Sequence, residues 1–173
     1  TTVDNLKMGA KKPPLPFSHA PLLKVLNHTF WFLPTVASCH AMANLIKQRQ
    51  NKFYHDYAIV VAAGIQAGIG VEAMPRVFDA MTDNPLESKT ITLSCGKLTT
   101  GISIKPWTGI FMLRNSSSPE TYFQAAFRVQ TPWVLKNPDS KSPNKEEILK
   151  EECYVFDFAP DRALRQIADY SCR

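Results

Sequence analysis

His28-Thr29-Phe30-Trp31-Phe32-Leu33 is the stretch of sequence that decides the fold. The run is rich in β-formers, is apolar on both faces and stops at Pro34, which is typical of a strand buried within a sheet. Residues 36–50 follow with apolar side chains at helical spacing, and residues 57–61 form a second apolar run. A strand, a helix and a second strand in this order predict a right-handed βαβ unit of a parallel sheet.

The same alternation continues to the end of the chain. Ser118 and Pro119 are a favourable N-cap and first-turn pair for a helix, and the polar, proline-containing residues 137–144 predict a loop. Further strands are expected at residues 90–93, 109–113 and 152–158, and further helices at residues 71–81, 119–130 and 161–170. We therefore expect an α/β domain with a mostly parallel sheet of about five or six strands flanked by helices.

Length and composition indicate a single globular domain. The 173 residues are 45% hydrophobic and 20% charged, which is enough for one sizeable core. The prolines of Lys11-Lys12-Pro13-Pro14-Leu15-Pro16 disfavour regular structure, so we expect residues 1–20 to be a leader or linker from a preceding domain and residues 21–173 to be one domain. No apolar run approaches the roughly 20 residues that cross a bilayer. We expect a cytoplasmic protein without a membrane partner.

Charge and metal-binding residue types give weaker indications. The 20 Lys and Arg residues exceed the 15 Asp and Glu residues, and the net charge of +5 suits a partner with phosphates, although many soluble domains are mildly basic. The four cysteines, Cys39, Cys95, Cys153 and Cys172, are scattered, and no two histidines stand at metal-ligand spacing on one helix face. We expect reduced thiols and no metal site.

Two glycine-containing segments are candidates for nucleotide binding. Gly68-Ile69-Gly70-Val71-Glu72-Ala73 fits the G-x-G-x-x-A pattern, in which a helix N-terminus holds a pyrophosphate. The carboxylate expected about 20 residues later is missing at Leu93-Ser94, yet a nucleotide- or dinucleotide-binding enzyme domain that uses residues 64–70 stays open as an alternative. Gly96-Lys97 lacks the Ser or Thr of a P-loop, so the chain alone is not expected to hydrolyse ATP.

A third candidate spans residues 98–113 and 118–132. Leu98-Thr99-Thr100-Gly101 offers hydroxyl groups and a close backbone approach, which suit phosphate oxygens. Gln124 and Arg128 stand four residues apart on the predicted helix and therefore point the same way. Arginine commonly holds the charge of a transferring phosphoryl group. On the residues alone, an ordinary loop and a helix whose arginine makes a surface ion pair is an equal alternative.

The order of these segments resembles motifs V and VI of superfamily-2 DNA helicases and translocases, in particular the restriction-enzyme branches with type I and type III Res subunits. L-T-T-G is followed by a strand, by S-P-x-x-Y-x-Q from Ser118, and by Arg128. The strand at 29–33 with Pro34-Thr35-Val36 resembles motif IV. The departures from the family pattern are Ser103 for the motif V Asp, Phe127 for a Gly of motif VI, and Thr131 for the second Arg, often described as the arginine finger.

The resemblance implies the second RecA-like domain of such a motor, a three-layer sandwich. ATP and Mg²⁺ would be held mainly by a preceding RecA-like lobe of the same polypeptide, which carries Walker A and B. The residues that would line this lobe's side of the ATP site are Gly101, Ser103, Gln124 and Arg128. Gln124 and Arg128 would be catalytic, with Arg128 stabilising the γ-phosphate.

DNA is the second partner that the resemblance implies. Thr35, Thr99 and Thr100 would contact the backbone of one strand, which gives grip without sequence specificity. Nuclease or methyltransferase domains or subunits would be further partners, and the isolated domain would be inactive. We expect the threonine-glycine bend and the helix of Gln124 and Arg128 to emerge on the same rim of the sheet. The alternative of a catalytically silent DNA- or partner-binding module fits Ser103 and Thr131.

Overall fold

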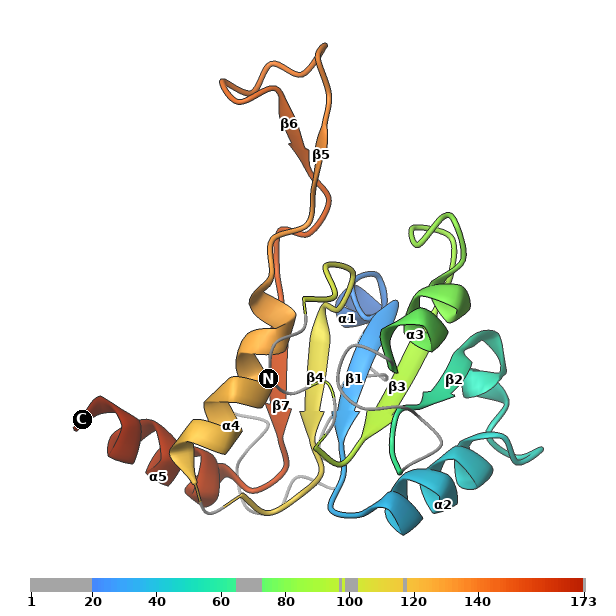
Figure 1. The fold of residues 1–173 in the computed structure, drawn as a ribbon, viewed down its shortest axis with the longest axis vertical. Helices are drawn as coiled ribbons and strands as arrows, with labels where there is room; N and C mark the ends of the chain where they lie inside the picture. Colours follow the sequence, from blue (N-terminus) through green and yellow to red (C-terminus); the bar gives the residue numbers. More distant parts are fainter. Residues whose placement is uncertain (1–19, 65–72, 97, 99–102, 117, 173) are drawn as a thin grey trace.

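A five-stranded parallel sheet forms the centre of the molecule (Figure 1). The computed structural model describes residues 20–64, 73–96, 98, 103–116 and 118–172. The strands lie in the order β2-β3-β1-β4-β7, and every neighbouring pair is parallel. Their bounds are β1 (His28–Phe32), β2 (Ala58–Val61), β3 (Thr90–Ser94), β4 (Gly109–Met112) and β7 (Tyr154–Asp157). The predicted α/β fold is confirmed, and its layers are compatible with a RecA-like domain.

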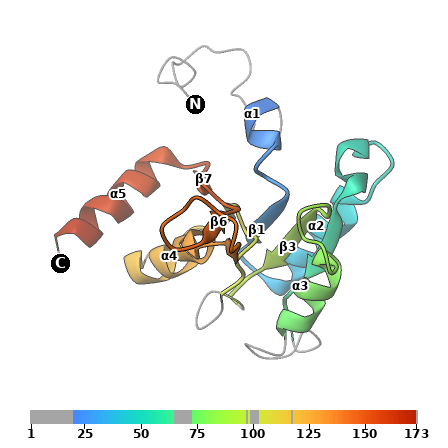
Figure 2. The same cartoon turned by 90° about the horizontal axis from the view of Figure 1, so that it is seen from above.

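Helices cover both faces of this sheet, toward its two lateral edges (Figure 2). α2 and α3 lie toward β2, whereas α4 and α5 lie toward β7. The helices are α1 (Ala20–Leu23), α2 (Val36–Ile46), α3 (Met74–Met81), α4 (Pro119–Ala126) and α5 (Pro160–Ser171), with 3₁₀ turns η3 (Lys52–Asp56) and η6 (Phe127–Gln130).

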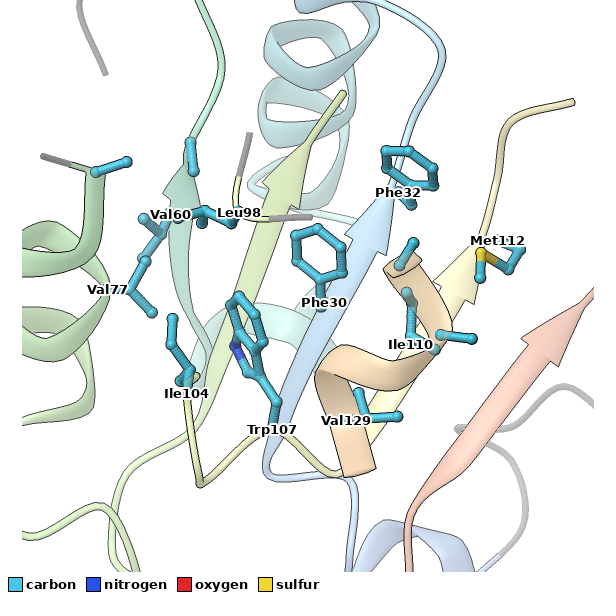
Figure 3. Close-up of a cluster of buried hydrophobic side chains, with 14 of the residues drawn as sticks. Phe30, Phe32, Val60, Val77, Leu98, Ile104, Trp107, Ile110, Met112 and Val129 are labelled. Atoms are coloured by element: carbon cyan, nitrogen blue, oxygen red, sulfur yellow. The ribbon is translucent and has the colours of Figure 1, made fainter. Parts of the chain in front are cut away.

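The central strand β1 supplies side chains to two separate cores. Phe30 and Phe32 point to the face that α3, α4 and the segment before β4 cover. Trp31 and Leu33 point to the opposite face and pack with buried residues of α2. Trp107, from the segment before β4, is fully buried against Phe30, with ring centroids 4.8 Å apart (Figure 3). This alternation explains why Phe30, Trp31 and Phe32 of β1 are all apolar, as a strand covered on both faces requires.

Three predicted helices have different bounds in the structure. α2 ends at Ile46 and not at residue 50, because Lys47 caps it and donates back to the carbonyl of Ala43. The helix predicted over 119–130 tightens into the 3₁₀ turn η6 at Phe127, in the last turn before Pro132. α3 begins at Met74, whereas the predicted start at residue 71 falls outside the described residues.

A two-stranded antiparallel hairpin was not predicted from the sequence. It consists of β5 (Val134–Lys136) and β6 (Glu146–Ile148), and it projects from the amino end of the sheet (Figure 1). The predicted loop over residues 137–144 lies between these strands. Each strand has only three residues, so it gives too short a pattern of alternation to be recognised.

The expected leader, residues 1–20, lies outside the described residues except for Ala20, so the domain division stays a prediction. Of the helices in the described part of the chain, none is both long and apolar enough to span a bilayer.

Candidate functional site

Thr35 lies at the carboxyl end of the sheet, directly after β1, where it begins α2. Its hydroxyl oxygen accepts from the backbone N–H of Ser38 at 3.1 Å, and its own backbone N–H donates to the Ser38 hydroxyl at 3.0 Å. This reciprocal pair is a capping box. Thr35 is exposed, and the first backbone N–H groups of a helix have no intrahelical acceptor. The structure therefore presents a helix N-terminus at the position that sequence reasoning assigned to DNA.

Arg114 adds a positive charge to the same end of the sheet. It follows β4, lies 4.8 Å over the ring of Phe32, and donates through Nη1 to the carbonyl of Cys95 at 3.1 Å. Its Nε has no hydrogen-bond partner among the described atoms. Sequence analysis did not single out this residue, although a basic side chain immediately after an apolar strand of a parallel sheet marks the ligand-binding end.

The side chain of a second arginine at this end is engaged in contacts with neighbouring residues. Arg162 pairs with Asp157 at the end of β7 and also donates to the side chain of Asn115 at 3.5 Å. Burial, together with the neighbouring Asp157, raises the pKa of Tyr122 to about 12. These contacts fasten α4 and α5 to the end of β7.

Arg128 lies at the other end of the sheet, although its helix begins at the carboxyl end. α4 runs back alongside the strands (Figure 1). η6, which contains Arg128, lies near the segment that precedes β4, because Lys150 bonds to carbonyls of both. Arg128 is half-buried, and its Nε donates to the backbone carbonyl of Gln124 at 3.1 Å. The side chain of Gln124 is exposed on α4. The two residues thus share one face of the helix, as their spacing predicts.

Ser103 belongs to the segment that reaches this amino end. Its side chain is exposed, whereas Ile104 and Trp107 beside it are buried in the core below α3 and α4. The ammonium of Lys150 joins this segment to the turn of Arg128. Its Nζ donates to the carbonyls of Lys105 at 2.9 Å, Trp107 at 3.0 Å and Val129 at 2.9 Å. Lys150 was not identified from the sequence, because it sits in a charged run whose ordinary place is a solvated surface.

A cavity of about 420 Å³ opens beside Lys150. His28, Leu86, Trp133 and Ile148 are among its lining residues. His28 donates through Nε2 to the carbonyl of Pro85 at 2.7 Å, and its Nδ1 lies 2.9 Å from the Thr90 hydroxyl. Burial lowers the pKa of His28, which favours the neutral ring. The amino end of the sheet is therefore hollowed and held by bonds between distant parts of the chain.

Several predicted site residues lie outside the described residues. These are Thr99, Thr100 and Gly101, and the glycine-rich segment after Gly64. Gly64 itself has a left-handed backbone with φ of 76°, which suits glycine. The expectation that the threonine-glycine bend shares a rim with Arg128 thus stays a prediction. Thr35 and Arg128 lie at opposite ends of the sheet.

The described residues contain no group of three or more side chains suited to hold a metal ion. All four cysteines are unpaired thiols; Cys39 is buried, and Cys95 is half-buried. Burial is the main cause that raises the pKa of Cys39 to about 12, with Cys95 beside it adding to the rise. Such a thiol stays protonated near neutral pH and is a poor nucleophile and metal ligand.

Comparison with known proteins places the chain beside a restriction-modification protein. No family model matches it. It is 35% identical over 160 residues to a Mycoplasma pneumoniae protein described as "Putative type II restriction enzyme and methyltransferase RM.MpnORF110P C-terminus". The match covers 90% of this chain and 21% of that protein, so the chain spans about a fifth of its relative's length.

Proposed function

We propose that this chain is the second motor lobe of an ATP-dependent DNA helicase or translocase that belongs to a restriction-modification protein. The observation that carries the proposal is a set of hydrogen bonds that connects two segments at the amino end of the sheet. There Lys150 binds the segment of Ser103 and the turn of Arg128 at once. These are the segments that resemble motifs V and VI, which in such motors form one ATP-binding surface.

The two ends of the sheet then have separate tasks. At the amino end, Arg128 holds the negative charge of the γ-phosphate, and Ser103 and Gln124 offer further exposed polar side chains. ATP with its Mg²⁺ is held mainly by a preceding lobe, and the lack of a P-loop lysine in this chain agrees with that division. At the carboxyl end, the N-terminus of α2 at Thr35 binds the DNA backbone without sequence preference.

The relative supports the restriction-modification setting. Its name describes a restriction enzyme and methyltransferase, and this chain matches a fifth of its length. A nuclease and a methyltransferase are accordingly the activities that we propose for the remainder of the protein. Opening and closing of this lobe against the preceding one, driven by ATP turnover, would move DNA toward or away from them.

Arg128→Ala in the complete protein tests the proposal. We expect DNA-stimulated ATP hydrolysis to fall by about 10³-fold or more, the range for removal of an arginine that stabilises a transferring phosphoryl group. DNA affinity and thermal stability should stay close to those of the unmodified protein. Arg165→Ala is the matched control, because Arg165 is an exposed arginine on α5. Normal turnover in Arg128→Ala would exclude the motor function, and so would robust ATP hydrolysis by the 173-residue chain alone.

A further inference from the structure

Lys150 occupies an unusual environment for a lysine in a charged stretch of sequence. Its ammonium has three N–H groups, and each has a carbonyl acceptor within 3.0 Å, from Lys105, Trp107 and Val129. Glu151 and Glu152, the next two residues, are exposed. A lysine normally keeps its charge in water, because burial costs free energy unless the charge gains partners. The three carbonyls supply those partners.

The three acceptors come from two segments that are separated in sequence by β4 and α4. Lys105 and Trp107 belong to the segment before β4, whereas Val129 is the last buried residue of η6. A positive charge at the carbonyl end of a helix is also favoured by the helix dipole. Lys150 therefore links two segments outside the strands by three hydrogen bonds, in addition to the packing of Trp107 and Val129 in the core beside Phe30.

The backbone of Lys150 is itself fixed at the base of the hairpin. The N–H groups of Leu149 and Lys150 both donate to the carbonyl of Trp133, at 2.9 and 3.3 Å. The ammonium therefore starts from a fixed backbone position, and its three hydrogen bonds add to the core packing that holds the turn of Arg128 near the segment of Ser103. The neighbours of these carbonyls in the chain are Arg128, one residue before Val129, and Ser103, two residues before Lys105.

We infer that Lys150 is a positioning residue for ATP hydrolysis, which holds the turn of Arg128 against the segment of Ser103 so that both face the same ATP molecule. The inference rests on the proposed function. Lys150 does not touch ATP; it acts through the two backbone segments. A small displacement of a catalytic group from its productive position weakens its interaction with the transition state more than its interaction with bound substrate. We therefore expect kcat to fall and KM to change little.

Lys150→Met in the complete protein removes the three donors and keeps most of the side-chain volume. We expect kcat for DNA-stimulated ATP hydrolysis to fall by about tenfold to a hundredfold, with KM for ATP and the dissociation constant for DNA changed by less than about twofold. Lys145→Met is the matched control, because Lys145 is an exposed lysine at the hairpin whose Nζ donates to a single carbonyl, that of Ser140, at 3.2 Å. The control should keep the full kcat.

Lys150→Arg is the second variant, and it tests the same point if the methionine variant does not fold. It retains the charge, but a planar guanidinium cannot aim three N–H groups at the same three carbonyls, so we expect kcat to fall by about threefold to tenfold. All assays are run at a temperature where circular dichroism shows the variants folded. Full kcat in the arginine variant, together with full kcat in any methionine variant that folds, would overturn the inference.

A double-mutant comparison separates positioning from mere stabilisation. If Lys150 acts through Arg128, the factor by which Lys150→Met lowers kcat should be smaller in an Arg128→Lys background, because the displaced group no longer contributes fully there. An unchanged factor would mean that Lys150 does not act through Arg128, and would overturn the inference. The proposed function is tested apart from this: Arg128→Ala with normal turnover would refute the motor, whereas an inactive Arg128→Ala beside a fully active Lys150→Met would refute only the role of Lys150.

Discussion

The two ends of the sheet are built in different ways. At the carboxyl end, Thr35 and Ser38 satisfy each other across three residues, so this part of the site forms with its own helix. At the amino end, Lys150 reaches carbonyls 21, 43 and 45 residues away in sequence. The difference indicates that the cap at Thr35 is a local structure, whereas the joined segments at the proposed ATP-binding end depend on contacts between distant parts of the chain.

Trp107→Ala should give the largest effect and would sharpen this contrast. The side chain is fully buried beneath Phe30 and lies in one of the segments that Lys150 holds. Truncation of a buried aromatic residue leaves a cavity and typically costs about 3–5 kcal/mol. We expect a loss of that size in the free energy of unfolding of the 173-residue chain, measured by urea denaturation.

Phe158→Ala is the comparison at the carboxyl end. Phe158 follows β7, is 52% exposed, and stacks on Phe111 at a centroid distance of 6.2 Å. Its truncation should cost about 1 kcal/mol or less, since much of the ring already contacts water. Equal losses for Trp107→Ala and Phe158→Ala would mean that the amino end is not tied to the core more firmly than the carboxyl end.

The contrast between local and distant bonds also explains what could be predicted from the sequence. The strands of the central sheet were found because β1 and β4 carry apolar side chains on both faces and β3 alternates Ile91 and Leu93 with β-forming threonines, patterns that lie within each strand. The start of α2 at Val36 was likewise predicted, and the cap that the structure shows at Thr35 lies directly before it. These features depend on neighbours in sequence.

Other features depend on contacts that the sequence does not display. The linking role of Lys150 could not be recognised from the sequence, since its acceptors are backbone carbonyls, which every residue carries. The position of Arg128 at the amino end follows from the length and direction of α4, and not from its spacing to Gln124. The hairpin of β5 and β6 was missed because its strands are too short for an alternating pattern.

The effect of pH on the free energy of unfolding is expected to be smaller than that of Trp107→Ala, and it tests the charge of Lys150 at the amino end. Burial lowers the pKa of Lys150 from 10.5 to about 8 in the folded chain. Between these two values the unfolded chain holds the proton that the folded chain has released, so the free energy of unfolding should rise with pH in this window. One proton limits the slope to about 1.4 kcal/mol per pH unit, and the solvent around this half-buried group makes the slope smaller.

The measurement is the difference in unfolding free energy between the unmodified chain and Lys150→Met from pH 7.5 to about 10.5, because subtraction removes the tyrosines and cysteines that titrate in both chains. The difference should shift in favour of the unmodified chain as the pH rises. A shift in the opposite direction would show that the three carbonyls outweigh burial and hold the pKa of Lys150 above its ordinary value.

Thr35→Ala is the smallest expected effect, and it examines the carboxyl end by itself. Loss of the cap should cost about 1 kcal/mol in the free energy of unfolding, and Thr35→Ser should restore it. In the complete protein, Thr35→Ala should weaken DNA binding by about threefold to tenfold, the worth of one hydrogen bond, and leave kcat at saturating DNA unchanged. That pattern is the reverse of the one expected for Lys150→Met.

Ser38→Ala distinguishes the two uses of the Thr35 hydroxyl. In the structure this hydroxyl donates to the Ser38 oxygen at 3.2 Å, so a phosphate must compete with Ser38 for its hydrogen. Removal of Ser38 Oγ breaks the capping box and also removes the competitor. Ser38→Ala should therefore lose stability, as Thr35→Ala does, yet bind DNA at least as tightly as the unmodified protein. If it binds DNA as weakly as Thr35→Ala, the threonine matters only because it begins the helix, and the DNA contact belongs to the backbone N–H groups of α2.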